Sequence, residues 1–96
     1  MRPMEYGVGL TISFRRGRPL AAYLTLPRRE GDHVARSKST PEGLVIDYAE
    51  DGREIGIEIP TPCGESMEAL LAKMKELDLE DAESELRPMQ RALAPA

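Results

Sequence analysis

Apolar and polar side chains alternate along two stretches near the start of the chain, Leu10–Phe14 and Leu20–Leu26. A period of two places every second side chain on the same face, as in a half-buried β-strand. The segment between the two stretches, Arg15–Pro19, contains a glycine and a proline that suit a chain reversal. Pro27 ends the second stretch, because proline has no N–H to donate to a strand ladder. These residues predict two strands joined by a turn.

A weaker alternation of small and polar residues runs from His33 to Ser39 and predicts a third strand. Arg36 and Lys38 lie within it, and cations on an edge strand discourage pairing with other chains. We therefore expect this segment at an edge of the sheet.

The strongest pattern is a β-hairpin over Gly43–Ile59 that turns at Asp51-Gly52. Asp-Gly is typical of a two-residue type I′ turn, in which both central residues have positive φ. That turn sets a register in which apolar residues face apolar residues and Glu50 forms a charge pair with Arg53. The predicted pairs are Glu50–Arg53, Ala49–Glu54, Tyr48–Ile55, Ile46–Ile57 and Leu44–Ile59. The opposite face, which we expect to meet solvent, carries Val45, Asp47, Gly56 and Glu58.

A helix of about residues 66–78 is predicted after the prolines at 60 and 62, with Ser66 as its N-cap and Glu68 in its first turn. Its apolar residues recur at helical spacing and form a stripe wide enough to cover one face of the sheet. The members of this stripe are Met67, Leu70, Leu71, Met74 and Leu77.

A second apolar stripe follows, and at about 100° per residue it lies roughly 80° around the helix axis from the first. Its members are Leu79, Ala82, Leu86, Met89 and Leu93. One straight helix cannot direct both stripes at one sheet. Either Asp78 caps a second helix after a break, or a single helix continues and presents its second stripe elsewhere. Pro88 disfavours helical backbone at Arg87 and indicates a kink or stop there.

Together these elements predict an α+β fold. An antiparallel sheet of about four to five strands, built from hairpins over about residues 10–60, is covered on one face by the helix of about 66–78. Residues 1–78 are predicted to form the domain and residues 79–96 a helical C-terminal extension. The length of 96 residues fits one domain with a modest core.

The amino-acid composition limits which residue types can form the core and which cellular compartment suits the chain. One Phe, three Tyr and no Trp leave a core of aliphatic residues and methionine. The single cysteine, Cys63, excludes an intramolecular disulfide and favours a reducing, cytoplasmic location. No apolar run approaches the roughly 20 residues that span a bilayer, and the first ten residues lack the apolar core of a signal peptide. We therefore expect no membrane partner.

The net charge of −4 is distributed unevenly along the chain. Residues 1–41, 42–64 and 65–96 carry net charges of +5, −5 and −4. A basic front and an acidic back favour contacts between subunits, including a homo-oligomer, as readily as contacts with nucleic acid. In the alternative interpretation, both ends are simply solvated.

Metal-binding and catalytic patterns are weak. His33 and Cys63 stand thirty residues apart, whereas a zinc site needs three or four such ligands at set spacing. The carboxylates between Asp47 and Glu58 lack the spacing of a calcium-binding EF-hand loop. Cys63 lies at a helix start, where a thiolate is stabilised, but no base is placed to activate it. The sequence thus predicts no metal site, no cofactor and no enzyme.

Basic residues cluster on two predicted turns and the edge strand, and both turns could reach one end of the sheet, as phosphate binding requires. The residues are Arg15, Arg16, Arg18, Arg28, Arg29, Arg36 and Lys38. A pI near 5.0 and few aromatic side chains for base stacking count against nucleic acid.

The strand Ala22–Leu26, the segment Val34–Ser39 and the hairpin Gly43–Ile59 together resemble the DUF2283 family of small bacterial and archaeal proteins. Its members typically show an Ala-Leu-Tyr-Ile strand and a Val-Asp-Tyr-Asp-x-Asp-Gly-x-x-Val-Gly-Ile-Glu-Ile hairpin. The resemblance covers about residues 12–60, half the chain. The first turn of this chain is basic, where that of the family is usually acidic, and the helical tail is longer than the family core requires.

The DUF2283 resemblance implies no activity, because the family has none established. Some members are encoded beside small toxin-like proteins, which implies antitoxin roles for those members only. No functional residue is carried over.

The function predicted from these patterns is a non-enzymatic protein-interaction module, similar to an antitoxin, that binds a small basic partner or self-associates. Its expected contact surface is the second stripe, which has no place in a two-layer domain: Leu79, Ala82, Leu86, Met89 and Leu93. The acidity of this segment would complement a basic partner. The alternatives are a small enzyme or metal-binding protein that uses the hairpin carboxylates, and a nucleic-acid-binding protein that uses the arginine turns.

Overall fold

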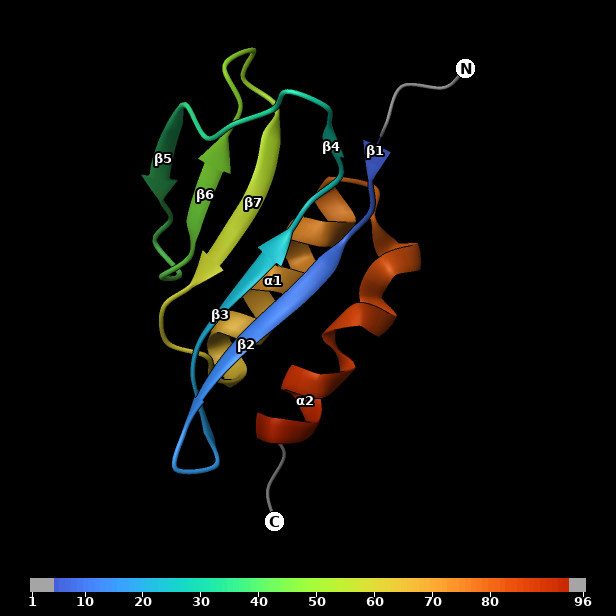
Figure 1. Cartoon of the computed structure of the whole chain (residues 1–96). Coiled ribbons are helices and arrows are strands. Elements are labelled where there is room, and N and C mark those ends of the chain that lie inside the picture. Colours follow the sequence, from blue (N-terminus) through green and yellow to red (C-terminus); the bar gives the residue numbers. More distant parts are fainter. Residues whose placement is uncertain (1–4, 94–96) are drawn as a thin grey trace.

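The structure, a computed structural model, describes residues 5–93 and has an α+β fold (Figure 1). Five antiparallel strands form one sheet in the order β2-β3-β7-β6-β5, a short β1–β4 pair extends one end of it, and the helices cover one face. The strands are β1 Glu5–Tyr6, β2 Gly9–Arg15, β3 Arg18–Thr25, β4 Arg28–Arg29, β5 Arg36–Ser39, β6 Val45–Tyr48 and β7 Glu54–Ile59. The helical elements are α1 Gly64–Glu76, the 3₁₀ segment η1 Glu80–Leu86 and α2 Arg87–Leu93. The predicted fold class is confirmed.

The first two predicted strands are β2 and β3, which pair antiparallel from Gly9↔Thr25 to Arg15↔Arg18. The register shifts between Ser13 and Phe14, because Ser13 pairs with Ala21 and Phe14 with Pro19. The predicted edge strand is also confirmed, although it begins at Arg36 rather than at His33.

The turn of the β6–β7 hairpin differs from the predicted two-residue type I′ turn. The Gly52 N–H donates to the Ala49 carbonyl at 3.0 Å and the Ala49 N–H donates to the Arg53 carbonyl at 2.8 Å. The loop therefore contains three residues, 50–52, of which Gly52 has a φ of 92° and Asp51 does not have a positive φ. A three-residue loop with glycine in the left-handed position also joins antiparallel strands without splaying them.

This longer loop changes the register beside the turn but not in the middle of the hairpin. Tyr48 pairs with Glu54 instead of the predicted Ile55, and Ile46 pairs with Ile57 as predicted. Ile55 is the extra residue, and the bulge it forms compensates for the residue added in the loop. Because the bulge restores the register, Ile55, Ile57 and Ile59 are all fully buried.

Helix α1 begins two residues earlier than predicted. Cys63 is its N-cap residue, and the predicted N-cap, Ser66, lies at the third helical position. There the Ser66 Oγ accepts a hydrogen bond from the Cys63 N–H at 2.8 Å, which satisfies a donor at the helix start from inside the helix. The predicted stripe faces the sheet: Met67, Leu70 and Met74 are buried and Leu71 and Leu77 are partly buried.

The chain breaks at Asp78 rather than continuing as one helix. Asp78 has a φ of 60°, its N–H donates to the Lys75 carbonyl at 3.1 Å, and the Leu79 N–H donates to the Met74 carbonyl at 2.8 Å. These two bonds are those of a Schellman C-cap, with Asp78 in the left-handed position. Arg87, contrary to prediction, has helical angles (φ −53°, ψ −43°). The 3₁₀ segment nevertheless ends at Leu86 and α2 begins at Arg87, so the helix changes where Pro88 indicated a kink or stop. Pro88 itself lies in the first turn of α2, where proline is tolerated.

The core is a single apolar cluster between the sheet and the helical elements. It contains Leu24, Ile46 and Ile57 from the sheet and, on the other side, residues of α1, η1 and α2. Leu86 and Met89 belong to it and are fully buried. Among the described residues, no helix is both long and apolar enough to cross a membrane.

Candidate interaction surface

The sheet face away from the helices carries a hydrogen-bonded network centred on Asp47, which is only 5% exposed. The Tyr23 hydroxyl donates to Asp47 Oδ2 at 2.9 Å and the Ser37 hydroxyl donates to Asp47 Oδ1 at 2.6 Å. The prediction that Asp47 and Gly56 face solvent is therefore wrong. Strands β3 and β5 flank the β6–β7 hairpin and bring Tyr23 and Ser37 over it.

Arg28 extends this network to the bulge in β7. Its Nη2 donates to the Tyr23 hydroxyl at 2.8 Å and its Nε donates to the Ile55 carbonyl at 3.0 Å. Burial, together with the bond to Asp47, raises the pKa of Tyr23 to about 12. A phenol with this pKa stays protonated near neutral pH and cannot act there as a general base. The network therefore joins side chains and backbone of β3, β5, β6 and β7 across the open face of the sheet.

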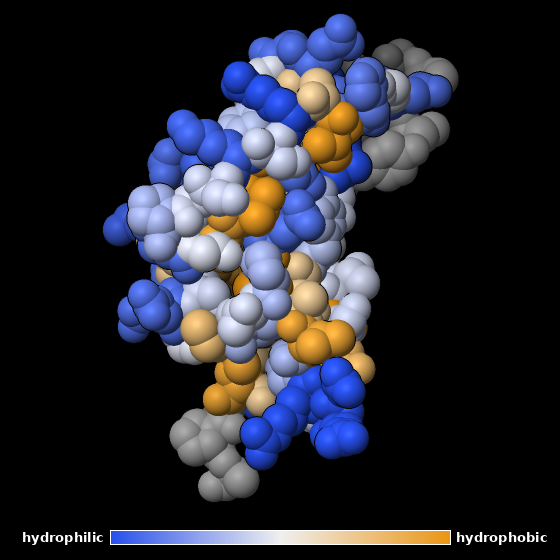
Figure 2. Space-filling model, turned by 90° about the vertical axis from the view of Figure 1, so that its left-hand side faces the viewer, coloured by the Kyte–Doolittle hydropathy of each residue, from blue (hydrophilic) through white to orange (hydrophobic). Residues whose placement is uncertain are grey.

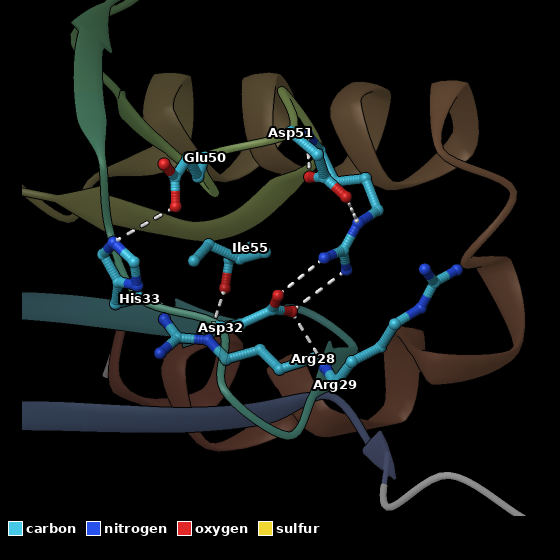
Figure 3. A network of polar contacts seen from close by, with 8 residues as sticks. Arg28, Arg29, Asp32, His33, Glu50, Asp51 and Ile55 are labelled. Carbon is cyan, nitrogen blue, oxygen red and sulfur yellow. Dashed lines mark hydrogen bonds and ion pairs between the residues drawn. The ribbon is translucent and has the colours of Figure 1, made fainter.

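A second polar cluster joins the 29–33 loop to the β6–β7 loop (Figure 3). Arg53 binds Asp32 with Nη2–Oδ1 at 2.6 Å and Asp51 with Nε–Oδ2 at 2.7 Å, and the Arg29 N–H donates to Asp32 Oδ2 at 2.8 Å. The predicted Glu50–Arg53 pair is wrong, because the three-residue loop directs Arg53 to Asp32. Glu50 instead lies 4.0 Å from the His33 Nε2.

The Asp32–Arg53 pair predicts a dependence of stability on acid pH. Hydrogen bonds from Arg53 and from the Arg29 N–H lower the pKa of Asp32 to about 2. A carboxyl whose pKa is lower in the folded state contributes stability above its unfolded pKa and loses it as the pH falls. We expect part of the free energy of unfolding to be lost between about pH 4 and about pH 2. Urea denaturation across this range should show a weaker dependence in Arg53→Gln.

Arg29→Gln is the matched control for this measurement. It removes the same charge, but the Arg29 side chain points away from the cluster and only its backbone N–H binds Asp32 (Figure 3). This variant should keep most of the acid dependence of the unmodified chain, because the Arg29 charge makes the smallest of the contributions that lower the pKa of Asp32. Equal pH profiles for the Arg53 and Arg29 variants would contradict the assignment to Asp32.

The basic residues of the two predicted turns do not meet at one end of the sheet, as the nucleic-acid alternative would require. Arg15, Arg16 and Arg18 lie at one end of the sheet, whereas β4, with Arg28 and Arg29, lies at the other (Figure 1). The two turns flank a single strand, β3, of eight residues, whose ends are about 23 Å apart. The guanidinium of Arg36 lies over the ring of Tyr48, 4.8 Å from its centroid. A continuous phosphate-binding surface is therefore not formed by these side chains.

No group of three metal-ligating side chains comes together within residues 5–93. Cys63 is exposed, and hydrogen bonding with Ser66 lowers the pKa of its thiol.

The second stripe, expected to bind a partner, lies against the core of the chain itself. Leu86 and Met89 are fully buried, and Leu79, Ala82 and Leu93 are partly buried against the same cluster. Because the chain changes direction at Asp78, the second stripe can pack against the same core as the first. One straight helix could not direct both stripes at that core. Partner binding through the stripe stays a prediction, and for Leu86 and Met89 it would require the segment to leave the core.

The outer side of β2, here called the β2 edge, pairs with no strand among the described residues. It is seven residues long, and the six from Gly9 to Phe14 carry no charge. Phe14 and Leu20, at the end of the β2–β3 hairpin, are 54% and 53% exposed. Arg15, Arg16 and Arg18 project from the same hairpin tip, and Figure 2 shows strongly hydrophilic residues beside apolar ones at this end of the molecule.

Sequence reasoning identified β2 but not this surface. The uncharged run was visible in the sequence, whereas the position of β2 at an edge depends on the order of all five strands. The exposure of Leu20 follows from the register shift at Phe14, which leaves Leu20 without a partner residue in β2.

Comparisons with known proteins give no indication of function. No family model, curated protein or solved structure matches the chain. The resemblance to the DUF2283 family stays a prediction.

Proposed function

We propose that the chain is a non-enzymatic protein-interaction module that binds a partner protein through the β2 edge and the adjoining hairpin tip. The observation that carries this proposal is an edge strand whose first six residues carry no charge and which ends beside two half-exposed apolar side chains, Phe14 and Leu20. A free strand edge offers backbone donors and acceptors to an added strand, and neighbouring side chains supply specificity.

The side chains at the tip define the chemistry of the partner. Burying the exposed parts of Phe14 and Leu20 would contribute on the order of 2 kcal/mol to binding. Arg15, Arg16 and Arg18 surround them, so a partner that presents carboxylates next to an apolar patch fits this surface. Nucleic acid is less well matched, because Arg28 and Arg29 lie at the far end of β3, and Arg36 and Lys38 lie on β5 at the other edge of the sheet.

An antitoxin-like function with a small basic partner would use a different surface. With the apolar stripe packed on the core, η1 presents exposed carboxylates to solvent. They are Glu80, Asp81, Glu83 and Glu85. Such a partner would bind by charge at η1, whereas the β2 edge supplies both backbone and apolar contacts.

Site-specific photo-crosslinking in the native cells tests the proposal. A photo-crosslinking phenylalanine analogue in place of Phe14 should capture a defined protein, which mass spectrometry of the adduct identifies. The same analogue in place of Glu42, which is exposed between β5 and β6, is the control and should not capture that protein. The same products at both positions, or no adduct at position 14, would contradict the proposal.

A further inference from the structure

We propose that the partner at the β2 edge is a second copy of this chain, and that the two β2 strands pair antiparallel about Ile12. Two five-stranded sheets would then form one continuous sheet related by a two-fold axis. This inference rests on the proposed function, because it uses the same edge and names its occupant.

The two edges of the sheet differ in how well they resist pairing. Strand β5 has four residues, Arg36–Ser39, two of which are cations, and a short charged edge discourages association. Strand β2 has seven residues, Gly9–Arg15, with a single charge at its end. A long uncharged edge pairs with another chain unless it is covered, so β2 is the edge suited to association.

The sequence of β2 is complementary to itself in one centred register. With Ile12 on the two-fold axis, Leu10 faces the partner's Phe14 and Thr11 faces the partner's Ser13. Apolar residues then meet apolar residues on the helix side, and hydroxyl groups meet on the open side. Each Phe14, 54% exposed in the single chain, gains an apolar neighbour. All seven residues of each strand take part, since Gly9 faces the partner's Arg15.

Charge favours the same arrangement. In each copy η1 lies toward the β1 end of the sheet and α2 toward the hairpin tip, and η1 packs near β2 (Figure 1). Antiparallel pairing places the hairpin tip of one copy beside the β1 end of the other. The tip carries Arg15, Arg16 and Arg18, and the η1 segment carries four exposed carboxylates. A parallel arrangement would instead place the two basic tips side by side, so charge favours the antiparallel orientation.

Sedimentation equilibrium of the full chain tests the inference, with substitutions at Thr11 and Ser13. Both side chains are exposed, so replacing them should not disturb the fold. We expect the unmodified chain to be a dimer. In Thr11→Lys/Ser13→Lys, lysines face lysines across the axis at two places, which should weaken dimerisation at least about 100-fold. Thr11→Glu/Ser13→Glu should behave in the same way.

An equal mixture of the lysine and glutamate variants is the decisive sample, because each lysine then faces a glutamate. We expect a 1:1 heterodimer from the two monomeric variants. The control is Ser39→Lys on the β5 edge, which should leave the dimer intact. Circular dichroism and thermal melting of each variant establish that it is folded.

Three results would contradict the proposal that the partner is a second copy of this chain. They are a monomer for the unmodified chain at every accessible concentration, a dimer that persists in both charged variants, and a mixture that fails to associate. A monomer that still forms a position-14 crosslink to another protein would overturn this inference while supporting the proposed function. A dimer lost in the charged variants, with a position-14 crosslink to the chain itself, would support both.

Discussion

Replacing Leu86 with alanine is expected to lower the free energy of unfolding by about 3 kcal/mol. Leu86 is fully buried at the end of η1 and belongs to the same apolar cluster as the sheet and α1. Truncation removes buried apolar surface and leaves a cavity that the surrounding core fills only partly. Since small domains are stable by only about 5–15 kcal/mol, this is a large fraction of the total. Urea denaturation followed by circular dichroism measures it.

Leu20→Ala is the matched control, because it removes the same atoms from a side chain that is 53% exposed in the single chain. At a concentration where the chain is monomeric, Leu20→Ala should change the free energy of unfolding by no more than about 0.5 kcal/mol. A Leu86→Ala variant as stable as the Leu20→Ala variant would show that residues 79–93 are not held on the core. The apolar stripe would then be free to bind a partner, as the sequence predicted.

The sequence predicted the sheet, α1 and the core register well, because those features depend on local periodicity. The pairing of Ile46 with Ile57 follows from counting outward from Asp51-Gly52 together with the apolar alternation of both strands. The position of the turn was predicted but its length was not, since Asp51-Gly52 also suits a three-residue loop in which the glycine alone has positive φ. The longer loop does not change the register in the middle of the hairpin, because the bulge at Ile55 returns the strands to the predicted pairing.

The features that sequence reasoning missed depend on contacts between distant segments. Asp47 looked like a solvent-facing residue when β6 and β7 were considered alone. Its burial requires Tyr23 from β3 and Ser37 from β5, and the strand order that places both beside it. In the same way, the stripe after Asp78 appeared to lack a place in the domain. The left-handed backbone at Asp78 redirects the chain, and aspartate adopts that conformation less often than glycine.

Gly56→Ala is expected to lower the free energy of unfolding by about 3 kcal/mol, at the upper end of overpacking costs. Gly56 lies under the Tyr23 ring on the open face of the sheet, opposite Asp47. A Cβ at this position would overlap the Tyr23 hydroxyl, lie 2.5 Å from its Cζ and lie 3.2 Å from Arg28 Nη2. Tyr23 cannot move aside without losing its bonds to Asp47 and Arg28. The substitution therefore strains the whole network.

The control for Gly56→Ala is Gly64→Ala at the start of α1, where no atom lies within 4 Å of the added Cβ. That variant should be neutral or more stable by up to about 1 kcal/mol, because alanine favours helix. A Tyr23→Ala background isolates the contact itself, since Gly56→Ala should cost much less once the ring is absent. The same cost in both backgrounds would show that the β7 backbone, rather than the Tyr23 ring, requires glycine at position 56.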